Sequence, residues 1–239
     1  MTYNMPNQPT LRIGGPVPPV LRTFMIFCGA GYFLQMLWPQ LTVIFGLTPA
    51  LFWKGFVFQL LTFHFLHGGL WHLLFNLLAL WMFAGELELL WGRAKFIVYL
   101  VVTGIGAGLC QVVFNPGLDI PVVGASGIIY GILLAFGMTY PNRLIYLYFL
   151  LPLKVKWFVI FLGLIELASS VSSTAQISGV AHLAHLGGMA FGFLFLRYDR
   201  LFMQLRDAYY RRKLKKLRKA QKDKIYIVRG DDDDKPYVH

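Results

Sequence analysis

The chain has 239 residues, of which 57% are hydrophobic and 14% charged, and its formal net charge at pH 7 is +11. Soluble domains carry about a quarter charged residues, so this composition indicates a polytopic membrane protein instead. Its two cysteines, Cys28 and Cys110, lie in different apolar segments and indicate neither a disulfide framework nor a metal site.

The first part of the chain combines a polar arm with an apolar segment. Residues 1–19 are polar and contain several prolines and glycines, which predicts a flexible arm on the cytoplasmic side. Residues 20–38 are apolar and long enough to cross a bilayer. Residues 39–66 are aromatic-rich, but prolines and glycines interrupt them. We expect this connection to lie at the membrane interface or to be partly inserted.

Five further apolar segments predict an all-α membrane protein with a bundle of six transmembrane helices. A turn at Asn115-Pro116-Gly117 and a Ser/Thr-rich loop at residues 169–178 separate some of them. Residues 142–153 are expected to form a short connection on the membrane surface. The later spans are expected at about residues 70–90, 95–114, 122–140, 155–171 and 180–196, which gives a membrane domain over residues 20–197.

Basic residues favour one orientation of these six spans. Arginines and lysines precede the first span, lie in the second-to-third and fourth-to-fifth connections, and fill the tail, whereas the opposite connections contain only Lys54. The positive-inside rule then places both termini in the cytoplasm, and we expect a bacterial inner membrane.

The tail, residues 198–239, is basic and has an acidic end. Twelve of the 22 Lys and Arg residues lie between Arg197 and Lys224, directly after the last apolar segment. Such a position is typical of a segment that binds anionic lipid, so we expect no nucleic-acid partner. The run Asp231–Asp234 predicts a solvated end, although Asp-Asp-Asp-Asp-Lys also resembles a protease-cleavable tag.

Polar residues within the second span form the first candidate site. His72 and Asn76 are four positions apart and therefore share a helix face. Both can donate hydrogen bonds, and polar side chains in a span usually face an interior cavity. They could stabilise an oxyanion; the alternative is a structural hydrogen bond between helices.

Ser126 is the candidate nucleophile. It follows Gly124-Ala125 and precedes Gly127 at the start of the fourth span, where the first backbone N–H groups of a helix lack partners and can stabilise a developing negative charge. His185 in the sixth span is the candidate base. Gly127 and Gly188 would let these two helices approach closely enough for a short Ser–His hydrogen bond. The alternative is that Ser126 is a helix cap and the glycines are ordinary packing.

A metal site and a catalytic triad are the two alternatives to the Ser126–His185 pair. His64/His67 and His182/His185 have spacings that could bind zinc, but no His-Glu-x-x-His sequence is present, so we expect no metal and no cofactor. Glu166 is the only acid deep in a span, and its spacing does not place it beside His185.

We therefore expect a Ser–His dyad rather than a triad. Tyr130, four residues after Ser126, could pack against the His185 ring and hold it in place.

Motifs on three expected spans resemble, in order and spacing, those of rhomboid intramembrane serine proteases. They are His72-x-x-x-Asn76, Gly124-Ala125-Ser126-Gly127 and Ala184-His185-x-x-Gly188. Tyr130 matches the tyrosine that follows the serine in this family, and Glu88 and Gly92 resemble its Glu and Gly after the second span. The match covers about residues 20–197. Many members carry Trp-Arg in the first loop, where Phe58-Gln59 stands here.

The resemblance implies six helices around a water-accessible cavity and cleavage of transmembrane protein substrates near the outer membrane face. It implies Ser126 as nucleophile and His185 as general base and then acid. His72, Asn76 and the Ser126 backbone N–H would form the oxyanion hole, and His182 would not be the base.

Two other functions are possible. A catalytically inactive relative that binds membrane proteins would be expected to lack Ser126 or His185, and both are present. A small transporter would be expected to show internal repeats, and none links the two halves.

Overall fold

The computed structural model describes residue 15, residues 17–147, 151–171 and 181–222, and the short strands β3 (Ile227–Val228) and β4 (Tyr237–Val238). The chain divides into two compact units, Met1–Phe195 and Leu196–His239. The expected arm up to residue 14, most of the Ser/Thr-rich loop and the acidic run Asp231–Asp234 lie outside the described residues.

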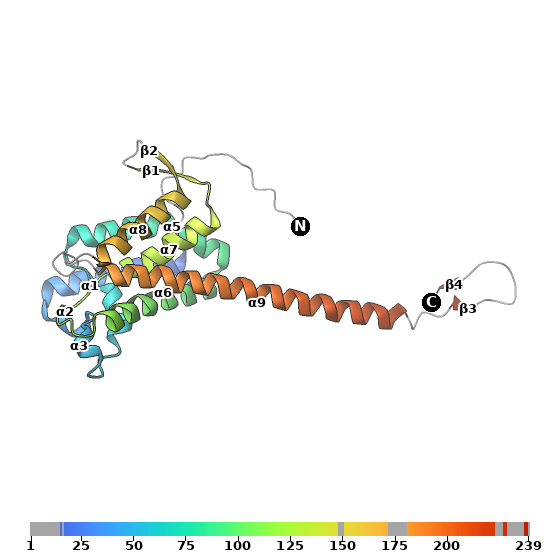
Figure 1. Cartoon of the computed structure of the whole chain (residues 1–239), viewed down its shortest axis with the longest axis horizontal. Coiled ribbons are helices and arrows are strands. Elements are labelled where there is room, and N and C mark those ends of the chain that lie inside the picture. Colours follow the sequence, from blue (N-terminus) through green and yellow to red (C-terminus); the bar gives the residue numbers. More distant parts are fainter. Residues whose placement is uncertain are drawn as a thin grey trace. The chain divides into compact units, whose positions relative to one another are not determined.

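In the described part of the chain, six helices overlap the membrane spans that the sequence predicts, but the sixth helix continues to Lys222, well beyond the expected end of its span at about residue 196 (Figure 1). They are α1 (Pro19–Leu37), α5 (Leu70–Trp91), α6 (Arg93–Phe114), α7 (Ser126–Thr139), α8 (Val155–Val171) and α9 (His182–Lys222). By length and composition, α1, α5 and α6 could each cross a membrane, and α7 is a shorter apolar helix. Three described helices are thus both long and apolar enough to cross a membrane, where the sequence predicts six spans.

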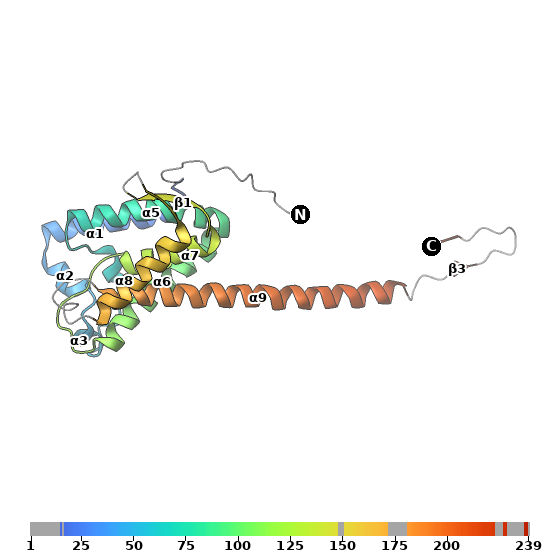
Figure 2. The same cartoon turned by 45° about the horizontal axis from the view of Figure 1, so that its top comes forward.

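A carboxylate of α5 holds the start of α1. Pro19 occupies the first turn of α1, where its missing N–H costs nothing. Glu88 of α5 is buried and accepts hydrogen bonds from the backbone N–H groups of Val20 at 3.0 Å and Leu21 at 2.8 Å. These N–H groups would otherwise lack partners, and the positive end of the helix dipole favours the carboxylate. Figure 2 shows the resulting side-by-side packing of α1 and α5.

The connection between α1 and α5 is folded rather than irregular. Gln59 is fully buried in it; its side chain accepts a hydrogen bond from Thr48 N at 3.1 Å and donates one to Ile44 O at 3.0 Å. Gln59, one of the two residues at which this loop departs from the resembled motif, therefore fixes the connection. Its elements are α2 (Gln40–Phe45), α3 (Pro49–Phe52), α4 (Gln59–Thr62) and the 3₁₀ turn η1 (Phe63–Phe65).

The start of α7 differs from the sequence-based expectation. We expected the fourth span to begin at about Val122, but the helix begins at Ser126. Val122 instead forms two backbone hydrogen bonds with Leu47, at 2.9 Å and 2.8 Å. The apolar residues before Ser126 are therefore extended and packed on the first connection, a difference that hydropathy does not reveal.

A β-hairpin leads into α8. Strands β1 (Leu144–Leu147) and β2 (Leu151–Lys154) pair antiparallel, and the expected surface connection of residues 142–153 contains them. Arg143, just before β1, forms an ion pair with Glu86 of α5 at 2.5 Å, which ties the hairpin to the helices.

Helix α7 lies at the centre of the first unit. It contacts α5, α6 and α8, and most of its residues are buried. Tyr99 of α6 donates a hydrogen bond from its hydroxyl to the carbonyl of Gly131 at 2.6 Å. This central helix carries Ser126 at its first residue.

Candidate functional site

Ser126 is placed by a constrained turn. Gly124 has φ of +125°, a backbone conformation that favours glycine. A Cβ built on Gly124 would lie 2.8 Å from Cε1 of His72, so the space also requires glycine. Ala125 is the N-cap of α7 and no side chain caps the helix. Because Ser126 is the first helical residue and not the cap, its hydroxyl is available for chemistry.

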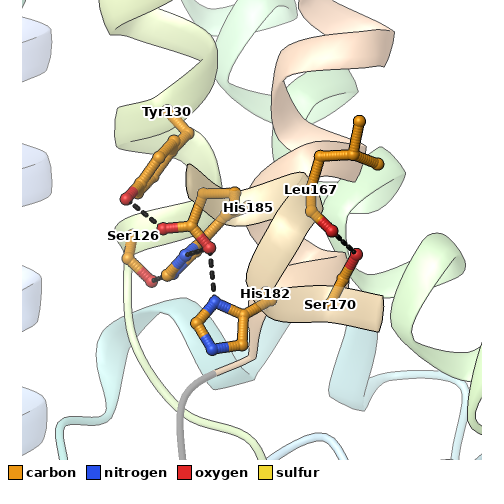
Figure 3. A network of polar contacts seen from close by, with 7 residues as sticks. Ser126, Tyr130, Leu167, Ser170, His182 and His185 are labelled. Carbon is orange, nitrogen blue, oxygen red and sulfur yellow. Dashed lines mark hydrogen bonds and ion pairs between the residues drawn. The ribbon is translucent and has the colours of Figure 1, made fainter. Parts of the chain in front are cut away.

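The hydroxyl of Ser126 meets the ring of His185. The Ser126 Oγ and His185 Nε2 atoms are 2.7 Å apart, and His185 is buried. This is the distance at which an imidazole can take the proton of a serine nucleophile. Figure 3 shows the pair in its surroundings.

Two glycines let α7 and α9 come this close. A Cβ built on Gly188 would lie 1.8 Å from the carbonyl oxygen of Gly127. A Cβ built on Gly127 would lie 3.2 Å from the carbonyl oxygen of Ala184 on α9. The structure thus brings both sequence-identified glycines into the contact between the helices that carry Ser126 and His185.

Tyr130 covers one face of the His185 ring. Its ring stacks on His185 with centroids 4.3 Å apart and planes 8° apart. Its hydroxyl donates a hydrogen bond to Glu166 Oε1 (Figure 3). The stacking that the sequence suggested is therefore present, and Tyr130 has a second contact that the sequence did not suggest.

Glu166 lies closer to His185 than its spacing in the sequence suggests. Its spacing along the chain does not place it beside His185, yet its Oε2 lies 3.1 Å from His185 Nδ1, within ion-pair distance although without a hydrogen bond. The same oxygen accepts a hydrogen bond from His182 Nδ1 at 2.6 Å. Spacing along α8 cannot report this contact, because it depends on how α8 is rotated against α9. A buried acid in an apolar helix was the available signal.

His72 and Asn76 lie beside the turn that precedes Ser126. A Cβ built on Gly124 would lie 2.9 Å from His72 Nε2 and 3.7 Å from Asn76 Nδ2. The Asn76 amide is buried, and among the described residues its Nδ2 has no hydrogen-bond partner. A buried donor without a partner is unusual. Such a donor is suited to hydrogen-bond an oxyanion, which exists only during a reaction.

The hydrogen bonds of His72 indicate its tautomer. Its Nδ1 accepts a hydrogen bond from the backbone N–H of Gly68 at 3.3 Å. In a neutral imidazole the other nitrogen then carries the proton. His72 Nε2 is therefore a donor on the side that faces Gly124.

Three side chains of the site could ligate a metal ion. Glu166, His182 and His185 each offer one ligand atom, and these atoms lie within 4.8 Å of one another. Hydrogen bonds among the site residues already engage the Glu166 carboxylate, through Tyr130 and His182. The sequence-based expectation of no metal stays a prediction.

An apolar cavity of about 560 Å³ lies elsewhere in the unit, lined by residues of α1, α6 and the first connection. Ile128 of α7 contributes to its wall, but Ser126 and His185 do not. It is therefore not the water-accessible catalytic cavity that the resemblance implies.

Comparison with known proteins agrees with the motifs. A family model described as the rhomboid domain matches residues 54–201. The chain is 33% identical over 143 residues to the putative rhomboid protease YdcA of Bacillus subtilis, covering 59% of this chain and 66% of that protein. It is 30% identical over 144 residues to rhomboid-like protease 5 of Toxoplasma gondii, covering 59% of this chain and 16% of that protein.

A third relative is the rhomboid protease GlpG of Yersinia enterocolitica, 30% identical over 139 residues, with 56% of this chain and 45% of that protein covered. The chain thus spans less than two thirds of the length of each of these relatives. The matched region of the family model contains all the residues of the candidate site.

Proposed function

Because the chain belongs to the rhomboid family, we propose that it is an intramembrane serine endopeptidase that cleaves transmembrane proteins near the outer membrane face. The observation that carries this proposal is the 2.7 Å contact between Ser126 Oγ and His185 Nε2. Several relatives are named as rhomboid proteases, which supports proteolysis at the level of the family.

In the proposed first step, Ser126 Oγ attacks the carbonyl carbon of the scissile peptide while His185 Nε2 takes its proton. The carbonyl oxygen becomes an oxyanion, and the donors that would stabilise it are His72 Nε2, Asn76 Nδ2 and the Ser126 backbone N–H. The unpartnered Asn76 amide and the tautomer of His72 support these roles.

Collapse of the tetrahedral intermediate breaks the C–N bond, and the proton held by His185 passes to the leaving amine. A water molecule then attacks the acyl-enzyme ester while His185 takes its proton; the ester C–O bond breaks, His185 returns the proton to Ser126 Oγ, and the new carboxyl end is released. These steps use side chains of the chain, the Ser126 backbone N–H and water, and they require no cofactor.

The protein is an integral membrane protein, and we propose that α1, α5, α6, α7, α8 and the first part of α9 all cross the bilayer. Both ends would then lie in the cytoplasm of a bacterial cell, with Ser126 toward the outer face. The basic residues that follow the last span would contact anionic lipid.

Substitution of the serine tests the proposal. The purified protein should cleave one or more members of a panel of single-span membrane proteins, and Ser126→Ala should abolish cleavage. Ser170→Ala is the matched control, because Ser170 lies on α8 and bonds only the carbonyl of Leu167 among the contacts described. Cleavage by purified Ser126→Ala would show that the nucleophile is wrongly assigned.

The alternative, a catalytically inactive binder of membrane proteins, makes a different prediction. A fluorophosphonate probe should label Ser126 of an active enzyme and leave Ser126→Ala unlabelled. A wild-type protein that binds members of the panel but neither cleaves them nor reacts with the probe would favour the binder.

A further inference from the structure

We propose that Glu166 is a positioning residue for His185, so that the site works as a Ser126–His185–Glu166 arrangement rather than as an isolated dyad. The inference rests on the proposed function and deepens it. Its basis is the place of the carboxylate: Glu166 Oε2 lies 3.1 Å from His185 Nδ1, on the side of the ring opposite the Nε2 that meets Ser126.

The position of Glu166 selects the tautomer that a general base needs. If Nδ1 of His185 were unprotonated, its lone pair would face a carboxylate oxygen at 3.1 Å, which is electrostatically repulsive. The proton is therefore favoured on Nδ1, which leaves the Nε2 lone pair toward Ser126 Oγ. After proton transfer the ring is positively charged, and the same carboxylate stabilises it.

Other contacts hold the carboxylate where this effect requires it. Tyr130 donates its hydroxyl to Oε1, and His182 Nδ1 lies 2.6 Å from Oε2. Tyr130 comes from α7, Glu166 from α8 and His182 from α9, so the carboxylate connects these three helices.

The cost of this arrangement also indicates a function. Glu166 is 5% exposed and lies in an apolar helix, where an acidic side chain is expensive and usually faces an interior site with partners. This carboxylate contacts the His185 ring as well as Tyr130 and His182, so its partners all lie around the ring that meets Ser126.

The decisive variant is Glu166→Gln, which keeps the shape and removes the charge. We expect kcat for a transmembrane substrate to fall at least about tenfold, with KM nearly unchanged, because the carboxylate acts on the charge of the ring and not on substrate binding. Labelling of Ser126 by a small fluorophosphonate should slow in parallel. Glu86→Gln is the matched control, since Glu86 pairs with Arg143 away from the site.

The tautomer provides a readout that does not depend on activity. In protein labelled with ¹⁵N-histidine, the ring signals of His185, assigned by their loss in His185→Ala, should show the proton on Nδ1. In Glu166→Gln the Nδ1-protonated form should lose population. A merely structural role for Glu166 would leave the tautomer of a folded variant unchanged.

Glu166→Asp covers the case in which Glu166→Gln does not fold. It keeps the charge on a shorter side chain, so its kcat should lie between those of the wild type and Glu166→Ala. Unchanged kcat and tautomer in folded Glu166→Gln, or Glu166→Asp no more active than Glu166→Ala, would overturn the inference while the protease function stands. A wild type without cleavage or labelling would instead refute the proposed function, and the tautomer would still test Glu166.

Discussion

Ser126 and His185 are 59 positions apart in the sequence, and different contacts hold each side chain. The Gly124 turn sets Ser126 at the first residue of α7, so its hydroxyl is not used as a cap. His185 is fixed by the stacked ring of Tyr130 on its face and by the carboxylate of Glu166 at its Nδ1 edge. The Ser126–His185 geometry therefore depends on the backbone conformation before Ser126 and on the side-chain contacts around His185.

The two neighbouring histidines should differ sharply when replaced. His185→Ala should be as damaging as Ser126→Ala, and the double variant no worse than either, because the pair acts as one unit. His182→Ala should keep substantial activity, since His182 does not contact Ser126 and the Tyr130 hydroxyl would still hold the Glu166 carboxylate. Initial rates of substrate cleavage would measure this, and the reverse ranking of the two histidines would show that the base is wrongly assigned.

Asn76→Ala should lower kcat more than it raises KM, because an oxyanion donor acts on charge present only in the transition state. Loss of one such donor costs about 2.7–4 kcal/mol in a soluble protease. We expect less here, since His72 Nε2 and the Ser126 N–H would remain. Rates over a range of substrate concentrations in detergent separate the two constants. A raised KM with unchanged kcat would remove Asn76 from the oxyanion hole.

At the scale of elements, the site depends on how closely α7 and α9 pack. The sequence indicated this contact through Gly127 and Gly188, because small residues at helix spacing point to close approach. It could not indicate Glu166, which comes from a third helix whose rotation no spacing records. It also misplaced the start of α7, because Val122 is as apolar in its extended pairing with Leu47 as it would be in a helix. Periodicity and composition predict each helix and which of its faces is apolar. Which residues of different helices touch depends on the tertiary structure.

Gly188→Ala tests the packing directly. Its Cβ would lie 1.8 Å from a backbone oxygen of α7, so the helices must move apart. We expect a loss of about 1–3 kcal/mol in stability, as in overpacked cores, and a larger loss of activity. Gly29→Ala on α1 is the control, because its Cβ would meet nothing within 4 Å. Thermal unfolding and cleavage rates measure both; a fully active Gly188→Ala would contradict the dependence on close packing.

At the scale of the whole molecule, the short length of α7 bears on how the first unit lies in the membrane. The 14 residues of α7 make a helix about 21 Å long at 1.5 Å per residue, shorter than a hydrocarbon core of about 30 Å. Gly188 and Gly127 bury this helix among its neighbours, so its ends need not reach lipid headgroups directly. The preceding extended residues can cover the remaining depth where they pack on protein.

The topology can be tested by the side on which two positions lie. Lys54 and Lys154 are both exposed, and three proposed spans, α5, α6 and α7, separate them. Single-cysteine variants Lys54→Cys and Lys154→Cys, with Cys28 and Cys110 replaced by alanine, should react with a membrane-impermeant maleimide from opposite sides of intact cells and inverted vesicles. Labelling after detergent treatment confirms that both thiols are reactive. An odd number of crossings requires opposite sides, so labelling of both from one side would mean that one of these helices, most simply the short α7, does not cross.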